Sequence, residues 1–238
     1  FALEMKGFEF DAVWAERRAG DRAEEIAPLI ATHDLEALRY LGELGAESPA
    51  REDLRRHAYV WARAAGDRSM TLWLTPDAMH WYREALRLGD ELDAPTAERA
   101  EVARALVRSS FGASREVAEY ACRRAIELAQ LAGDDLGAGW AHAWQMLALL
   151  GEGREADAPE HGERALALLE PLGETRELAE ALRLIGQFQW RVGEGVEAEA
   201  SSRRAAAIAD RVGAADIQAA AVQDLAVELT QTGRTREA

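Results

Sequence analysis

Apolar residues recur three and four positions apart along most of the chain. The segment LAEALRLIGQFQW, residues 178–190, shows the pattern clearly, with polar residues filling the positions between. Residues spaced in this way line one face of a helix that has 3.6 residues per turn. No segment has a convincing strand pattern, and we therefore predict an all-α protein.

The helical segments repeat with a period of 40 residues. YREALRL at 82–88 is followed by CRRAIEL at 122–128, GERALAL at 162–168 and SRRAAAI at 202–208, without insertion or deletion. Alanine returns at two positions of every copy: Ala78, Ala118, Ala158 and Ala198 at the first, and Ala85, Ala125, Ala165 and Ala205 at the second. A period of this length in a helical chain is typical of a solenoid of stacked hairpins, in which each hairpin completes its neighbour's core.

Glycines mark the turns between the helices in the same register. Gly133, Gly173 and Gly213 follow one helix of the repeat, and Gly153, Gly193 and Gly233 lie in the other turn. Glycine just past a helix adopts the left-handed C-cap conformation without steric penalty. The pattern predicts hairpins over 50–91, 95–132, 134–172 and 175–212, and a truncated one from 215. We therefore predict two regions: an off-period helical lead-in, residues 1–48, and a solenoid of about five hairpins, residues 49–238.

The recurring alanines allow two helices to cross closely, because a large side chain there would hold the backbones apart. In this pattern the chain resembles the tetratricopeptide-repeat family, which has alanine at both positions and an aromatic residue three positions before the second. Tyr82 fills the aromatic position, whereas Cys122, Gly162 and Ser202 depart from it. The family also has a small residue in the first helix of each hairpin. At this position the first and fourth copies have Gly66 and Gly186, whereas the second and third have Leu106 and Met146.

The tetratricopeptide resemblance covers about residues 50–238, although the period of 40 exceeds the family's usual one. It implies a right-handed α–α superhelix built from hairpins with longer helices. It also implies a concave groove, lined by the first helix of each hairpin, that binds a protein or peptide.

A second resemblance concerns the lead-in. ERRAGDRAEEIAPLIATHDLEALRYLGELG, residues 16–45, is similar to the segment that joins the ATPase module to its helical repeats in bacterial signalling ATPases of the STAND class. That segment usually has two adjacent histidines followed by an aromatic residue, where this chain has Thr32, His33 and Asp34. Many such proteins carry a nucleotide cyclase or a DNA-binding output domain. The resemblance implies a sensor or scaffold arm whose catalytic parts lie elsewhere.

Acidic residues far outnumber basic ones, and the formal net charge is −15. This charge argues against a nucleic-acid backbone or an anionic membrane as the main partner. The single cysteine and the lack of an apolar run long enough to span a bilayer lead us to expect a cytoplasmic protein. The chain begins with Phe1 and breaks off in GRTREA where another helix is expected, so we expect a piece of a longer protein. The oligomeric state is not indicated.

The sequence offers little that suggests catalysis. A phosphate-binding loop of the G-x-x-x-x-G-K-[ST] type is absent, and Lys6 is the only lysine. His80 with Glu84, and Asp157 with His161, have the i,i+4 spacing of two metal ligands on one helix, but neither pair has a visible third ligand. Cys122 occupies a packing position of the repeat. We therefore expect no catalytic residues, no cofactor and no metal.

Tryptophans and arginines indicate where a partner binds. When the family's groove-lining positions are projected onto this chain, they fall on Phe111, Trp140, Leu147, Arg183, Gln187, Trp190, Arg191 and Gln223. Aromatic and arginine side chains are enriched among binding hot spots, and guanidinium groups suit acidic groups on a partner. The pattern leaves open whether Trp140 and Trp190 line the groove or pack between adjacent repeats.

Two functions fit these observations. The first is a binding module that recognises a protein or peptide in the groove. The second is a regulatory arm that senses a small molecule and controls an attached ATPase, cyclase or transcription-regulator domain. A closed apolar pocket would favour the second function.

Overall fold

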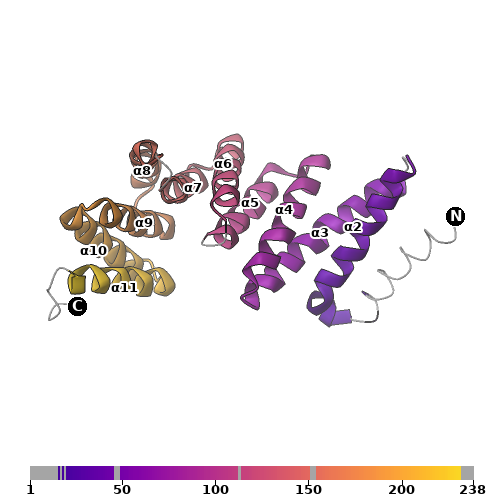
Figure 1. Cartoon of the computed structure of the whole chain (residues 1–238), viewed down its shortest axis with the longest axis horizontal. Coiled ribbons are helices and arrows are strands. Elements are labelled where there is room, and N and C mark those ends of the chain that lie inside the picture. The colour runs from indigo at the N-terminus through magenta and orange to yellow at the C-terminus, as the bar shows by residue number, and fades with distance from the viewer. Residues whose placement is uncertain are drawn as a thin grey trace. The chain divides into compact units, whose positions relative to one another are not determined.

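The computed structural model describes residues 16, 18, 20–45, 49–111, 114–150 and 154–231, and within these ranges it contains helices and no strands (Figure 1). The α-helices are α2 (Ala27–Glu43), α3 (Pro49–Thr71), α4 (Thr75–Glu91), α5 (Thr96–Ser110), α6 (Arg115–Ala132), α7 (Asp135–Ala148), α8 (Ala158–Leu169), α9 (Arg176–Val192), α10 (Gly195–Arg211) and α11 (Ala215–Gln231). There are also short 3₁₀ helices in the described residues. η1 (Gly20–Ile26) precedes α2, η2 (Glu155–Asp157) precedes α8, and η3 (Glu170–Leu172) follows α8. The all-α prediction is confirmed.

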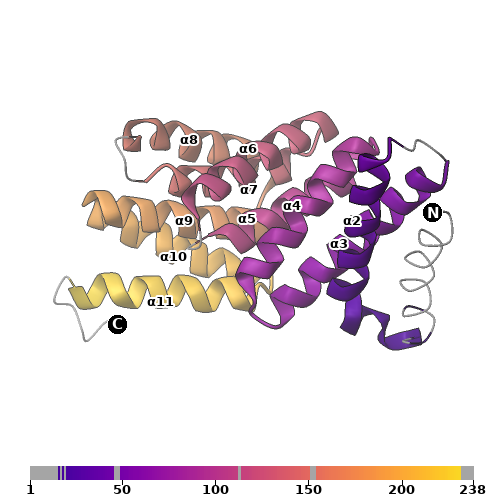
Figure 2. The same cartoon turned by 45° about the vertical axis from the view of Figure 1, so that its right-hand side comes forward.

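The chain forms two compact units, divided between Ser114 and Arg115. In the first unit, α2 packs on α3, α3 on α4 and α4 on α5, side by side in chain order (Figure 1). In the second unit, α7 packs on α6 and α8, and α10 packs on α9 and α11 (Figure 2). The first helices of successive repeats also pack together there, α7 on α9 and α9 on α11. The predicted boundary after residue 48 is a different division and stays a prediction.

Helix ends agree closely with the predicted hairpins. α3 and α4 form the first hairpin, α7 and α8 the third, and α9 and α10 the fourth, while α11 begins at the start of the fifth predicted one. The helices of the second predicted hairpin, α5 and α6, belong to different units. All eight recurring alanines are buried, and Ala118, the most exposed of them, retains only 4% of its accessible surface. Such burial is what a close contact between helices requires.

The residues at two facing positions of a hairpin compensate one another in volume. Within the first hairpin, a β-carbon on Gly66 would lie 2.5 Å from Cε1 of Tyr82, so the large ring of α4 occupies the space opposite a glycine of α3. In the third hairpin the sizes are reversed, and a β-carbon on Gly162 would lie 2.9 Å from the Met146 sulfur. One small residue in each pair therefore preserves the close approach of the helices.

The first prediction tests this close approach. Gly66→Ala should destabilise the fold by roughly 1–3 kcal/mol through overpacking against Tyr82, although alanine has the better helix propensity. The matched control is Gly42→Ala in α2, where the added carbon meets nothing closer than 3.5 Å. That variant should be neutral or stabilised by up to about 1 kcal/mol. Chemical denaturation measures both, and a Gly66→Ala variant as stable as the control would contradict the packing.

Trp73 occupies a conformation that usually belongs to glycine. It follows α3 with φ +59° and is 87% exposed. Its N–H donates to the Met70 carbonyl, and the Leu74 N–H donates to the Ser69 carbonyl at 2.8 Å. This is the Schellman cap, and Gly193, at the same position of a later repeat, forms it with φ +90°.

We predict that Trp73→Gly stabilises the fold by up to about 1 kcal/mol, because glycine relieves the left-handed strain that an L side chain bears. The reciprocal change, Gly193→Ala, should destabilise it by about 1 kcal/mol for the same reason. Thermal melts of the two variants measure the effect. A loss of stability in Trp73→Gly would show that the exposed indole stabilises the fold more than its backbone strain destabilises it.

Candidate partner-binding site

The predicted groove residues of α9 lie where this helix packs along α11. Gln187, Trp190 and Arg191 line a depression of about 180 Å³ together with Asp224, Val227 and Glu228 of α11. Three of the eight predicted groove residues thus meet in one concave site within the second unit. Gln223 is exposed on α11 but is not among the lining residues.

Local sequence signals fix the position of α9. Its N-cap is Thr175, whose hydroxyl accepts a hydrogen bond from the Leu178 N–H at 3.1 Å. The helix ends at Gly193 in the left-handed conformation, which places Trp190 and Arg191 in its last turn. The Arg191 charge there complements the negative end of the helix dipole. The Trp190 ring packs beside Gly195, where an added β-carbon would lie 3.5 Å from Cζ3, and remains half-buried.

Arg183 and Gln187 already share a carboxylate inside the chain. Nη1 of Arg183 lies 3.1 Å from Oδ2 of Asp224, and the Gln187 amide donates to the same oxygen at 2.9 Å. All three side chains are at least partly buried. The expectation that both arginines meet acidic groups of a partner therefore needs correction for Arg183. Arg191, by contrast, is exposed and has no ion pair with any residue that the structure describes.

Trp140 and Leu147 do not line a groove. Trp140 is completely buried, and its indole N–H donates to Oε2 of Glu180 at 2.8 Å. Leu147 is buried as well. The physical reason is that α9 packs directly on α7 and covers this face. The choice that the sequence left open is thus settled for Trp140, which belongs to the core between repeats.

Phe111 directly follows α5 in the first unit and is half-buried. It is not among the residues that line the depression on α9 and α11. The structure therefore supports a smaller site than the sequence pattern suggested, centred on Trp190.

Carboxylates give the depression its electrostatic character. Glu228 is buried and accepts a hydrogen bond from the Ser202 hydroxyl at 3.0 Å. Burial raises the pKa of Glu228 above its ordinary value. The site thus combines an indole, a valine, an amide and an exposed guanidinium with two carboxylates. This mixture suits a polar peptide that contributes one apolar side chain better than it suits a bare anion.

The structure pairs histidines that the sequence left scattered. Nδ1 of His142 on α7 lies 2.8 Å from Nδ1 of His161 on α8. Burial lowers the pKa of His142 to about 4, with a further contribution from His161, and burial also lowers the pKa of His161. Both rings are therefore neutral at pH 7, and one donates to the other. Among the described residues, no group of three or more His, Cys, Asp or Glu side chains is arranged to hold a metal ion.

A further histidine, His57 of α3, joins α3 to the lead-in. Its Nδ1 lies 2.7 Å from Oδ2 of the buried Asp34, and its Nε2 lies 3.1 Å from Oε2 of Glu16. The hydrogen bond to Asp34 is the main cause of the raised pKa of His57. Asp34 lies on α2, within the predicted lead-in. A histidine in the next helix contacts it, and no local sequence signal indicated this contact.

Cys122 lies in the core, as its packing position in the repeat predicts. Cys122 is completely buried, and burial raises the pKa of its thiol, so it packs rather than reacts. In the described part of the chain, none of the helices has the length and apolar character needed to cross a membrane.

Comparison with known proteins establishes the fold but not a family. No protein-family model matches the chain, and no curated protein matches it. The chain is similar to the crystal structure of BtubC (BKLC) from P. vanneervenii, with a TM-score of 0.56 and 17% identity over 90% of this chain and 86% of that one. It is also similar to the apo form of RapI, with a TM-score of 0.55 and 14% identity over 87% of this chain and 71% of that one.

RapI is a tetratricopeptide-like helical-repeat protein. At these sequence identities the two likenesses show the helical-repeat fold alone, which confirms the fold class expected from the 40-residue period. The link to STAND-class signalling ATPases and cyclases stays a prediction.

The histidine pair generates a pH prediction. Because the folded-state pKa of His142 lies below its ordinary value, the unfolded chain binds protons more readily, and stability falls as pH decreases below about 6.5. Between pH 7 and pH 5 the His142→Gln variant should lose less stability than the parent chain, by about 1 kcal/mol. Urea titrations at the two pH values measure the difference. The exposed His80, changed to Gln, is the control, and equal pH dependence of the parent and His142→Gln would contradict the assignment.

Proposed function

We propose that this chain is a binding module that recognises a protein or peptide partner through the face formed by α9 and α11. The observation that carries the proposal is the depression at which Gln187, Trp190 and Arg191 meet α11. The helical-repeat fold supports it, since such folds present extended surfaces built from rigid helices. Fold alone does not determine function, and the site is therefore the stronger argument.

The chemistry of the depression indicates what the partner presents. Trp190 and the exposed Val227 offer apolar contact area beside Arg191. Because Asp224 already engages Arg183, Arg191 is the guanidinium that can meet an acidic group. We therefore propose that the partner inserts one apolar side chain beside the indole and places a carboxylate near Arg191.

The proposed wider context is a larger bacterial signalling protein in which this chain is a scaffold or sensor arm. The similarity of residues 16–45 to the linker of STAND-class ATPases supports this context. The proposal assigns no catalysis to the chain itself, and any ATPase, cyclase or output domain belongs to other parts of such a protein. Small-molecule sensing is less well supported, because the lining of the depression on α9 and α11 includes charged side chains and is not purely apolar.

The experiment selects peptide ligands for the chain from a random library and measures their affinities for two double variants. Trp190→Ala with Arg191→Gln should weaken binding by more than about 2 kcal/mol, because the change removes a candidate hot spot. Val196→Ala with Arg203→Gln, which alters exposed residues of α10, should leave the affinity unchanged. Circular dichroism confirms that both variants are folded. Ligands that lose affinity for the α10 variant and keep it for the α9 variant would show that the site is placed on the wrong face.

A further inference from the structure

A larger cleft lies within the first unit, between α2, α3 and α4. Its volume is about 490 Å³. It is lined by Leu35, Leu38 and Arg39 of α2, Arg51 and Arg55 of α3, and Glu84, Arg87 and Glu91 of α4. None of these residues belongs to the site around Trp190, and of them the sequence pattern had singled out only Glu84, for its spacing from His80. Two of the three helices, α3 and α4, form the first hairpin, while α2 belongs to the off-period lead-in.

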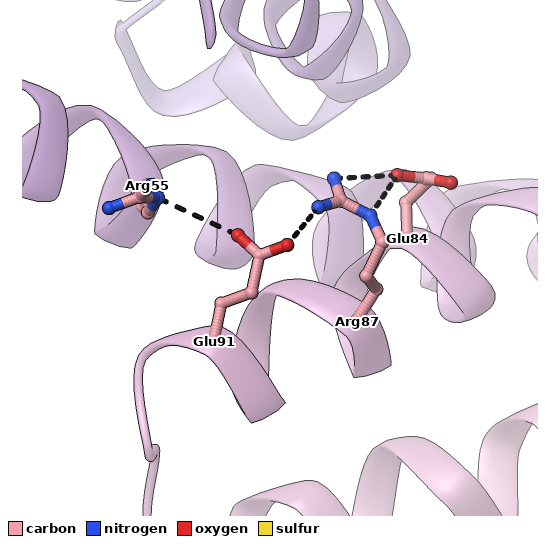
Figure 3. A network of polar contacts seen from close by, with 4 residues as sticks. All are labelled: Arg55, Glu84, Arg87 and Glu91. Atoms are coloured by element: carbon pink, nitrogen blue, oxygen red, sulfur yellow. Dashed lines mark hydrogen bonds and ion pairs between the residues drawn. The ribbon is translucent and has the colours of Figure 1, made fainter. Parts of the chain in front are cut away.

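Arg87 organises the polar wall of the cleft (Figure 3). Its Nε and Nη2 lie 3.0 and 2.9 Å from one oxygen of Glu84, and its Nη1 lies 2.5 Å from Glu91. The other oxygen of Glu91 faces Arg55, whose Nε lies 3.6 Å away, beyond hydrogen-bond distance. Glu91 thus bridges two guanidinium groups and holds one of them only loosely.

Two arginines that line this cleft are held only by long ion pairs. Nε of Arg55 lies 3.6 Å from Glu91, and Nε of Arg39 lies 3.9 Å from Glu43, a residue of α2 outside the lining. Neither contact is within hydrogen-bond distance. Arg55 is partly buried and Arg39 is exposed, so both guanidinium groups can turn toward an anionic ligand, in a chain whose formal net charge is −15.

We propose that the cleft between α2, α3 and α4 binds an acidic peptide segment whose carboxylates meet Arg55 and Arg39 and whose apolar side chain packs on Leu35 and Leu38. Guanidinium groups bind carboxylates in a bidentate manner. When Arg55 binds a ligand carboxylate, it loses only its long contact with Glu91. The two leucines and the volume of the cleft favour a peptide over a bare inorganic anion. Nucleic acid is disfavoured by the negative charge of the whole chain.

In this arrangement Glu91 is an internal competitor of the ligand. A carboxylate that takes Arg55 replaces the loose contact with Glu91, while Glu91 keeps its hydrogen bond to Arg87. Glu91→Gln should therefore strengthen binding, because it removes a negative charge next to the incoming one. A purely structural role of the network predicts no such gain.

The test is a fluorescence-anisotropy titration of the chain with a labelled peptide of alternating glutamate and leucine. Arg55→Gln should weaken binding about tenfold, and Glu91→Gln should strengthen it about threefold. The matched control is Arg56→Gln, the next residue of α3, which pairs with Glu52 and Asp53 and does not line the cleft. Its affinity should remain unchanged, and that of the parent chain should fall as salt rises from about 50 to about 300 mM.

Three results would overturn the proposal. The first is equal binding of a peptide in which glutamine replaces glutamate. The second is an equal loss of affinity in Arg55→Gln and Arg56→Gln. The third is full displacement of the peptide by inorganic phosphate at concentrations at which chloride has no effect, which would identify a phosphate site instead. Because the variants lie in the first unit, failure here leaves the test of the Trp190 site unaffected.

Discussion

The close approach of the two helices in the hairpins α3–α4, α7–α8 and α9–α10 is the constraint on which the rest of the structure depends. Eight buried alanines lie in the packed helices, and in two hairpins a glycine faces a larger residue, as Gly66 faces Tyr82. Protein interiors are packed densely enough that one added methyl group at such a contact matters. This spacing sets how the first helices of successive repeats meet, and therefore which side chains remain accessible.

Contact between the first helices then decides what is available for binding. Residues about 40 positions apart come together between them: Trp140 with Glu180, Arg176 with Asp216, and Arg183 with Asp224. These links join one repeat to the next. Polar groups that form them are engaged within the chain and are less available to a partner. Arg183 is the clearest case, because its ion pair is only partly exposed and Gln187 supports the same carboxylate. Trp190 and Arg191, about one turn beyond Gln187 along α9, remain for recognition.

The sequence was sufficient for those features that depend on periodicity. Helix bounds, the recurring alanines and the turn glycine Gly193 follow from a pattern that repeats every 40 residues. Periodicity gives the direction of a side chain such as Trp140 but not the helix that covers it, and so it could not separate groove from core. The pairing of Arg183 with Asp224 joins two helices 41 residues apart, with no local signal for it. The arginine-lined cleft was missed because it includes α2, which lies outside the 40-residue register.

The central claim is that a partner contacts the second unit at the last turns of α9 and the adjoining part of α11. Hydrogen–deuterium exchange of the whole chain, with and without a library-selected peptide at saturation, tests it most directly. The account predicts that slower exchange on binding is concentrated in segments 186–193 and 222–230, and that α10 changes little. Protection concentrated in α10, with α9 and α11 unchanged, would contradict it.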